Sequence, residues 1–404
     1  MKVKHIYVVH KIENHPIFSS LYYHPPKNLK IVYRDLPYFE KHGEGLDENI
    51  SLYQKSSSTK RIFYFFKLAY FKLLEVLNFP IIILILPSKN LSYDYLLTLP
   101  LVLSTKKFIT FVNYLGMFVN WDDARLNSKI CISIIRKLLL SNRCKYIFNL
   151  SKSSKKMLID VLRIPKNKQS KFKTLYPSME PKDKIIRNNE SIRLLFIAAS
   201  HKWDPLFNFY MKGGKLVLKA YEKLKPKYKN IELIYIGKIP LEYENLIEKI
   251  PDIKRYLRVP YEKVLEFYNK SDIFLFPTYG DVFGFAFIEA MAHGLPIICI
   301  DNNYAATEMV INNETGFVIQ TSQKFLAFPF SKYCPDWLNE KKWHKNIKKE
   351  DDIVGLKNFT DKLEILIQNK DLREKFGENG RKRLVDGDLS IMHRNRKLYD
   401  LFSN

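Results

Sequence analysis

The sequence predicts an α/β protein built from two doubly wound, mostly parallel sheets. Its 404 residues are many for one hydrophobic core, so two domains of ordinary size are the natural division. Short apolar segments alternate with amphipathic ones along the chain, as strands and helices do in such folds. The alternation restarts after a polar, proline-containing stretch near residues 176–190, which predicts an interdomain linker.

Five apolar runs in the first half predict strands. They are KHIYVV (4–9), FPIIILIL (79–86), YDYLLTL (93–99), KKFITFVN (106–113) and CKYIFNL (144–150). The last run leads into SKSSKKMLIDVL (151–162), whose serines predict the N-cap region of a helix.

The second half repeats the pattern more clearly. Strands are expected at 192–200, 231–237, 272–278 and 296–300, and helices at about 213–225, after Pro260, and from Gly284 to His293. We therefore expect domains at 1–182 and 183–388, with a helix in 389–404 that can cross back to the first domain. Ligands in such folds bind beyond the carboxyl ends of the strands, so a cleft between the domains is the expected site.

The net charge of +24 indicates an anionic partner. Residues 1–180 hold 29 Lys and Arg against 12 Asp and Glu, whereas residues 181–404 hold 37 against 30. Nucleic acid, an anionic membrane or an acidic substrate would each fit this surplus, and so would a solvated lysine-rich surface without such a partner. No helix-turn-helix, zinc-finger or RNA-binding motif supports the nucleic-acid alternative.

Other classes of site lack their signatures. The four cysteines are isolated, with no Cys-x-x-Cys pair, which favours a reduced protein without structural zinc. Neither a Gly-x-Gly-x-x-Gly fingerprint nor a phosphate-binding Walker loop occurs. The N-terminus has too short an apolar core for a signal peptide, and residues 76–87 are too few to span a bilayer.

Residues 59–79 form a basic, aromatic segment with helical amphipathicity. Its charged side chains gather on one side and its aromatic and aliphatic side chains cover the other. Such a helix can lie on an anionic bilayer, and it can equally pack on the first sheet as an ordinary domain helix.

Two stretches have the residues for binding phosphate and hydroxyl groups. In YMKGGKLVLKAYEKL (210–224), Lys212 precedes two glycines at a helix start, where free N–H groups favour a phosphate; the alternative is a tight turn beside a solvated lysine. In DVFGFAFIEAMAHGLP (281–296), Glu289 lies on a helix that is apolar on nearly all sides. Its carboxylate either faces a ligand, such as the two hydroxyls of a ribose, or is neutralised by neighbouring amides or a lysine.

The segment PTYGDVFGFAFIEAMAHGLPIICIDNNYAATEMVINNETGFVI (277–319) resembles the signature region of family 4 glycosyltransferases, which have the GT-B fold. That signature is Glu-x7-Glu, here Asp281-x7-Glu289, with Ala290, Met291 and Gly294 also in place. The resemblance extends more loosely over residues 145–390.

The resemblance implies an acceptor-binding first domain and a nucleotide-sugar-binding second domain. Glu289 corresponds to the carboxylate that holds the ribose, Asp281 to the one that contacts the transferred sugar, and Lys212 to the diphosphate-binding lysine. Asp281 and Lys212 are thus the expected catalytic residues. The expected donor-binding residues are Glu289, Lys212, Gly213, Phe283, Gly284, Phe285, Pro260 and His201.

Three departures from the family pattern stand out. Asp281 is one methylene shorter than the usual Glu, the Gly-Arg usual after the strand at 192–200 is replaced by AASHKWD, and the Gly-rich loop after the first strand is replaced by YVVHKIENH. His201 or Lys202 can substitute for the missing arginine. His10 and Asn113 are the candidates on the acceptor side.

The resemblance implies a retaining, metal-independent glycosyltransferase that needs no cofactor, because the nucleotide-sugar is its substrate. Its acceptor is a glycan or a lipid-linked molecule, and no nucleic acid is expected. The basic segment 59–79 and the charge surplus leave an anionic membrane surface open as a further partner. We expect a cytoplasmic protein. The alternative is a protein attached peripherally to the cytoplasmic face of the membrane. The alternatives are a glycosyltransferase-like binding protein without turnover and, less favoured, a basic nucleic-acid-binding protein.

Overall fold

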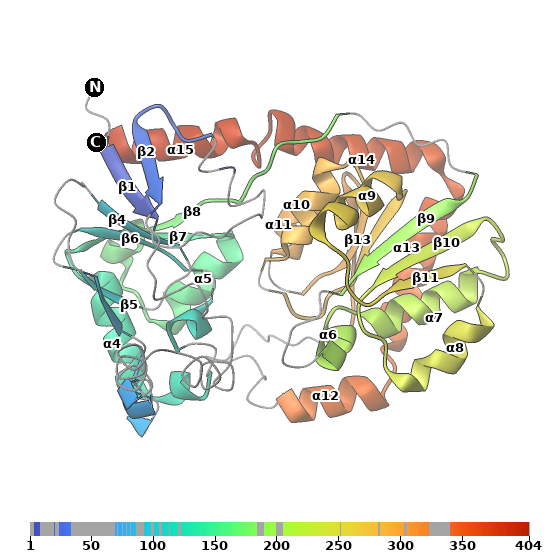
Figure 1. Ribbon diagram of the computed structural model, residues 1–404, viewed down its shortest axis with the longest axis horizontal. Coiled ribbons are helices and arrows are strands. Elements are labelled where there is room, and N and C mark those ends of the chain that lie inside the picture. The colour runs from blue at the N-terminus through green and yellow to red at the C-terminus, as the bar shows by residue number, and fades with distance from the viewer. Residues whose placement is uncertain are drawn as a thin grey trace, which may run out of the picture.

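The chain folds into two α/β halves joined along one edge by its C-terminal helices (Figure 1). The computed structural model describes residues 4–8, 20, 24–33, 69–70, 72–74, 76–77, 79–80, 82–85, 93–97, 101–104, 107–112, 114–119, 123–183, 190–198, 205–250, 252–281, 283–302, 305–322 and 340–403.

The first half is built on six parallel strands in the order β2-β1-β4-β6-β7-β8. These are β1 (Lys4–Val8), β2 (Leu29–Tyr33), β4 (Tyr93–Leu97), β6 (Phe108–Phe111), β7 (Cys144–Asn149) and β8 (Phe172–Thr174). β3 (Ile82–Ile85) and β5 (Leu101–Ser104) pair with each other in a separate two-stranded sheet. The strand expected at 79–86 therefore forms, but it does not join the main sheet.

Helices cover one face of this sheet through a continuous apolar cluster that includes Ile135 and Leu158. They are α4 (Lys129–Leu140) and α5 (Lys152–Val161), with 3-10 turns at η1 (Leu115–Val119), η2 (Asp123–Asn127) and η3 (Lys166–Lys171). The predicted serine cap of α5 is confirmed, because the Ser151 hydroxyl accepts a 3.0 Å hydrogen bond from the Ser154 N–H.

The second half contains another six parallel strands, in the order β11-β10-β9-β12-β13-β14. They are β9 (Ile192–Ile197), β10 (Ile231–Ile236), β11 (Ile253–Tyr256), β12 (Ile273–Phe276), β13 (Ile297–Ile300) and β14 (Gly316–Ile319). The chain winds outward from β9 on one side and from β12 on the other, so the winding reverses between these two strands. These two parallel sheets confirm the predicted fold class.

Ten helices and one 3-10 turn of the described chain follow β9. They are α6 (Pro205–Met211), α7 (Gly214–Leu224), η4 (Leu241–Tyr243), α8 (Glu244–Lys249), α9 (Tyr261–Lys270), α10 (Phe285–Ala292), α11 (Ala306–Met309), α12 (Glu340–Lys349), α13 (Ile353–Gln368), α14 (Lys370–Val385) and α15 (Ile391–Ser403).

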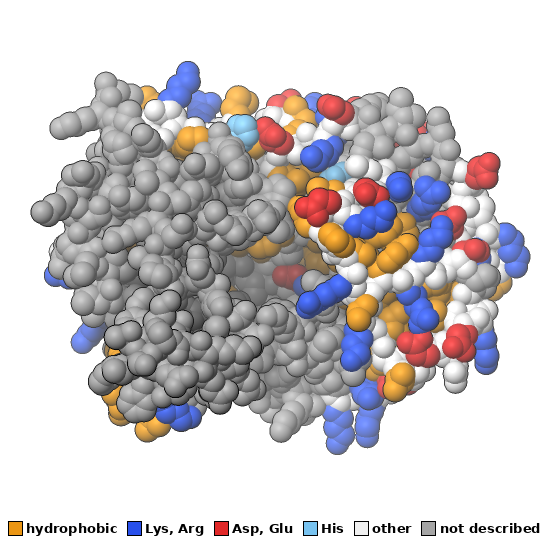
Figure 2. All heavy atoms as spheres, viewed as in Figure 1, with side chains coloured by type: hydrophobic (Ala, Val, Ile, Leu, Met, Phe, Trp, Pro, Cys, Tyr) orange, Lys and Arg blue, Asp and Glu red, His pale blue; other side chains and the backbone are white. Residues whose placement is uncertain are grey.

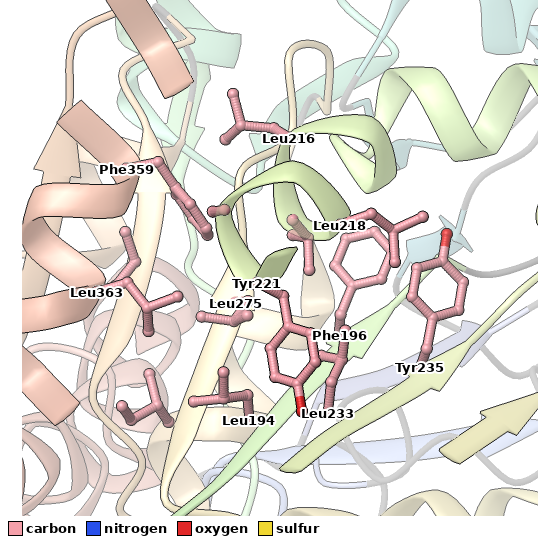
Figure 3. Close-up of a cluster of buried hydrophobic side chains, with 14 of the residues drawn as sticks. Leu194, Phe196, Leu216, Leu218, Tyr221, Leu233, Tyr235, Leu275, Phe359 and Leu363 are labelled. Carbon is pink, nitrogen blue, oxygen red and sulfur yellow. The ribbon is translucent and has the colours of Figure 1, made fainter. Parts of the chain in front are cut away.

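Two apolar clusters fix these helices on opposite faces of the second sheet. Figure 3 shows the first, in which Tyr221 from α7 and Phe359 from α13 meet the side chains of Phe196 and Leu275 from β9 and β12. The second joins α9 and α10 to the other face. Strand side chains buried on both faces explain why these segments read as continuous apolar runs in the sequence.

The C-terminal helix α15 packs on the first half of the molecule, beside β1 and β2 (Figure 1). The Tyr146 hydroxyl of β7 donates to the Leu401 carbonyl at 3.2 Å, and its ring meets Phe402 edge-on at 5.9 Å. Arg394, 5% exposed, donates to the Ser20 hydroxyl at 2.7 Å. Helix α15, which follows α14 of the second half, therefore binds the two halves together.

Glu308 of α11 makes a second link between the halves. Its carboxylate accepts hydrogen bonds from the backbone N–H groups of Lys152 and Ser153 at 2.8 and 2.7 Å, from the Ser153 hydroxyl at 2.5 Å, and from the Tyr176 hydroxyl at 2.7 Å. The first residues of α5 carry N–H groups that lack partners within the helix, so a carboxylate of the second half completes the start of a helix of the first.

Candidate functional site

The expected site residues follow the two strands between which the winding reverses. Lys212 and Gly213 come after β9 and α6, and Asp281 comes after β12, the neighbour of β9. In open α/β sheets this reversal leaves a crevice at the carboxyl ends of the strands, where ligands bind. The Tyr279 N–H donates to the Met211 carbonyl at 2.8 Å, which ties the two loops together.

Gly213 lets the start of α7 approach the end of β12. It has a φ of +80°, and a Cβ at this position would lie 2.2 Å from the carbonyl oxygen of Pro277. Only glycine fits this left-handed, crowded position without displacing the strand end. The 11-residue helix α7 then begins with N–H groups that have no intrahelical acceptor. These N–H groups give the loop a positive end suited to a phosphate group.

Lys212 and Asp281 form an ion pair across the loops. The Lys212 ammonium contacts the Asp281 carboxylate, and the two side chains are 16% and 19% exposed. The same ammonium lies 5.3 Å from the centre of the Phe276 ring. The pair brings the two expected catalytic residues together in a partly desolvated place, where electrostatic interactions are stronger than in bulk water.

The loop that holds Asp281 runs directly into α10. The Phe283 N–H donates to the Asp281 carboxylate at 3.3 Å, and the rings of Phe283 and Phe285 lie 5.5 Å apart. Gly284 is the N-cap with a φ of +75°, and a Cβ there would lie 2.8 Å from the Phe276 ring. The two aromatic side chains and this glycine thus fix the direction in which α10 begins.

Glu289 is 6% exposed and its carboxylate accepts from two tyrosine hydroxyls of α9. Tyr261 donates to Oε1 at 2.7 Å and Tyr268 donates to Oε2 at 3.1 Å. Each hydrogen bond to a charged group contributes about 1.5–3 kcal/mol, which offsets the cost of desolvating the carboxylate. Each carboxylate oxygen can accept more than one hydrogen bond, so a tyrosine partner does not exclude a hydroxyl of a ligand.

The two tyrosines were not expected from the sequence. Tyr261 and Tyr268 stand seven residues apart, which places them on one face of α9, and that spacing is the signal that could have found them. Burial and the neighbouring Glu289 raise the pKa of both phenols above the ordinary value. Both therefore stay protonated and act as donors toward Glu289.

Of the remaining predicted site residues, Pro260 lies within the part of the chain that the structure describes. Pro260 is the N-cap of α9, and its carbonyl accepts from the Lys263 N–H at 3.0 Å. His10, Asn113 and His201 lie outside the described residues. Among the described part of the chain, no group of three or more His, Cys, Asp or Glu is placed to hold a metal ion.

The face of the second half seen in Figure 2 carries charged side chains of both signs. Figure 2 shows basic and acidic side chains interspersed there, and the surface beside them is hollowed, with an acidic side chain in the hollow. This matches the small charge surplus of residues 181–404 and leaves the Lys212–Asp281 pair as a local feature.

Comparison with known proteins extends the local picture. Residues 208–350 match the family model of glycosyl transferases group 1. This match contains Lys212, Asp281 and Glu289, so all three lie inside the group 1 region.

Two curated relatives carry glycosyltransferase names. The chain is 28% identical over 181 residues to the capsular polysaccharide biosynthesis glycosyltransferase CapM of Staphylococcus aureus, covering 43% of this chain and 38% of that protein. It is 25% identical over 298 residues to an uncharacterized glycosyltransferase of Haemophilus influenzae, covering 70% and 74% of the two chains. The match to CapM thus spans well under half the length of that relative.

Solved structures show the fold. WaaG, a glycosyltransferase involved in lipopolysaccharide biosynthesis, superposes with a TM-score of 0.53 at 15% identity, covering 99% of this chain and 100% of that one. HepE of Anabaena, solved in complex with UDP-glucose, gives a TM-score of 0.53 at 10% identity over 99% of each chain. The chain therefore has the GT-B fold of two Rossmann-like domains.

Proposed function

We propose that the protein transfers a glycosyl group from a nucleotide-sugar to an acceptor. The observation that carries the proposal is the spacing of two partly or wholly buried carboxylates on one loop and helix, Asp281 and Glu289, with Lys212 paired to the first. The group 1 match and the two named relatives support the same activity.

Glu289 binds the ribose of the donor in this proposal. Its carboxylate already accepts from two hydroxyls, those of Tyr261 and Tyr268, and a ribose presents two adjacent hydroxyls of the same chemistry. Pro260, the N-cap of α9, lies one residue before Tyr261 and borders the nucleoside. HepE of Anabaena was solved with UDP-glucose, and another structural neighbour, pneumococcal GtfA, with UDP and GlcNAc, which supports a nucleotide-sugar donor.

Lys212 and the start of α7 bind the donor diphosphate. The positive end of the helix and the ammonium neutralise the charge that develops on the leaving phosphate. Lys212 then turns from Asp281 to the phosphate, and Asp281 accepts a hydrogen bond from a hydroxyl of the transferred sugar.

The reaction retains the configuration of the anomeric carbon. The bond between that carbon and the phosphate oxygen breaks, and a bond to the acceptor oxygen forms on the same face. The acceptor proton passes to the departing phosphate oxygen, so no other co-reactant is needed. Because Lys212 and the helix start supply the positive charge, the proposal includes no metal ion.

The acceptor is a glycan or a lipid-linked molecule at the cytoplasmic face of a membrane. The described residues between 69 and 77 are helical, and Tyr70, Leu73 and Val76 are 41%, 54% and 69% exposed, while Leu74 is buried. This apolar ridge favours peripheral attachment over complete packing on the first sheet. Within the described residues, no helix combines the length and apolarity needed to cross a bilayer.

A donor panel tests the proposal. Wild-type protein is titrated with UDP-, GDP- and other nucleotide-sugars, and release of the nucleotide is followed with and without acceptor glycans. Binding of at least one donor with turnover supports the enzyme. Binding of a donor without turnover would instead indicate a glycosyltransferase-like binding protein, and tight, salt-sensitive binding of nucleic acid without donor binding would favour the third alternative.

A further inference from the structure

A cavity of about 810 Å³ lies between α5, β8 and α15, at the joint between the first half and the C-terminal helix. It shares no lining residue with the proposed donor site. Its lining contains five lysines and two aspartates, together with apolar side chains. The lysines are Lys152, Lys155, Lys156, Lys173 and Lys397.

The lysines come from three separate elements. Three of them recur at helical spacing on α5, Lys173 lies on β8, and Lys397 lies on α15. Burial lowers the pKa of Lys155, and the charge of Lys173 lowers it further. The fold therefore holds Lys155 and Lys173, from two different elements, close together against their mutual repulsion.

The cavity offers these cations little compensation. Lys155 and Lys173 are half-buried and, within the described part of the chain, form no ion pair, and the two lining aspartates, Asp160 and Asp400, are at exposed positions. Like charges that are partly removed from water are unfavourable unless an anion binds among them.

The cavity also has an apolar wall. Phe148, Ile159, Leu175 and Leu401 line it beside the lysines, and Gln169 and Thr174 add neutral polar groups. A ligand with a multiply charged phosphate group fits the cations, and an apolar portion next to that group would fit the wall.

We propose that this cavity is a binding site for a phosphate group, carried either by a free polyphosphate or by a lipid headgroup. The site does not depend on glycosyl transfer, because neither its residues nor its charge serves the donor. The site lies where the two halves meet. One of its walls is α5, the helix of the first half whose first N–H groups donate to Glu308 of the second half.

Lysine footprinting tests the site directly. Full-length protein is acetylated under limiting reagent, alone, with inorganic pyrophosphate, with phosphatidylcholine vesicles, or with vesicles that also contain phosphatidylglycerol, and peptides are read by mass spectrometry. We expect pyrophosphate or the anionic vesicles to slow modification of Lys155 and Lys173 severalfold. Lys166, exposed on η3 outside the cavity, is the internal control.

The two sources give different results. Protection by pyrophosphate indicates a free phosphate ligand, and protection by the anionic vesicles alone indicates a headgroup. Repeating the pyrophosphate arm with Lys212→Gln keeps the donor site from contributing. Equal modification of Lys155 and Lys173 under all four conditions would overturn the proposal, and so would equal protection of Lys166.

Substitution provides the second measurement. The double variant Lys155→Gln, Lys173→Gln removes two cations and leaves two neutral polar side chains, and Lys166→Gln is the matched control. We expect about tenfold or greater loss of affinity for the protecting probe in the double variant, with a circular dichroism spectrum like that of the wild type. An unchanged affinity in the folded double variant would exclude the site.

Discussion

Glu289→Gln replaces one oxygen of a buried carboxylate by an amide NH2 and removes its charge, with almost no change in shape. In the structure each carboxylate oxygen already accepts one tyrosine hydroxyl, at 2.7 Å from Tyr261 and 3.1 Å from Tyr268. In the proposed complex each oxygen also accepts one ribose hydroxyl. The amide NH2 cannot accept, so one ribose hydroxyl loses its partner and the other loses a charged one.

The magnitude follows from the loss of one charge-assisted hydrogen bond. Such a bond contributes about 1.5–3 kcal/mol. Its loss should raise the dissociation constant for the nucleotide-sugar roughly 10- to 150-fold. Isothermal titration calorimetry with the donor selected from the panel measures it. Glu314→Gln, at an exposed position of the same half, makes the same chemical change away from the site and is expected to bind like the wild type.

Tyr261→Phe separates the carboxylate from its tyrosine partner. It removes one donor to Glu289 but leaves the charge, so the donor should bind with a much smaller loss than in Glu289→Gln. An unchanged dissociation constant in Glu289→Gln would refute the assignment of Glu289 to the ribose. A loss in Tyr261→Phe as large as in Glu289→Gln would assign the ribose contact to the phenol instead.

Three further substitutions test the start of α7, the link between the halves, and the connection between α14 and α15. Gly213→Ala forces a Cβ toward the Pro277 carbonyl at a φ of +80°, so thermal denaturation should show a loss of unfolding free energy of more than about 1 kcal/mol. Glu308→Gln weakens the charged bonds that join the two halves, and differential scanning calorimetry should show their transitions moving apart; a single unchanged transition would contradict the linking role. Burial alone would raise the pKa of Asp388, but hydrogen bonds and charge from Arg383 outweigh it and hold that pKa below the ordinary 3.8. The stability that this carboxylate contributes is therefore complete above 3.8 and lost as pH falls through the depressed value, so Asp388→Asn should destabilise at pH 7 and converge with wild type in acid, which a pH series of urea melts would measure.

The second half was predictable from its sequence because its strands are buried on both faces. β9, β10, β12 and β13 all fall within the expected apolar runs, and α10 (Phe285–Ala292) lies within one residue of the expected helix. Gly294, two residues after that helix, has a φ of +64°. Continuous apolar runs and glycine punctuation are strong local signals.

The short strands β8 and β11, at the edges of the two sheets, were not predicted from the sequence. β8 (Phe172–Thr174) has three residues and β11 (Ile253–Tyr256) four, and in β11 two of these are exposed charged side chains. Such strands have too few buried positions to produce a periodic pattern. They form because a neighbouring strand offers unpaired backbone groups, which is a tertiary effect that local sequence does not record.

The hydrogen-bond partners of the site residues were also not predicted from the sequence. The sequence pointed to Glu289 and left open whether amides or a lysine neutralise it, whereas the structure gives tyrosine hydroxyls from α9. Glu308 joins the two halves through Ser153 and Tyr176, a contact that the sequence does not predict. These contacts bridge 28, 155 and 132 positions of sequence between Tyr261 and Glu289, Ser153 and Glu308, and Tyr176 and Glu308. No local pattern specifies such pairs.

The ion pair between Lys212 and Asp281 suggests a role for Asp281, which stands where the family signature has the longer Glu. In the structure, Asp281 holds the lysine ammonium at the carboxyl ends of β9 and β12, beside the start of α7. A lysine that is already oriented loses less side-chain entropy when a diphosphate arrives than one that is free in solvent. The same pairing also opposes binding, because the ammonium must leave one anion for another. Asp281→Glu would extend the carboxylate by one methylene and Asp281→Asn would remove its charge, so comparing the two variants separates the reach of this side chain from its hold on Lys212.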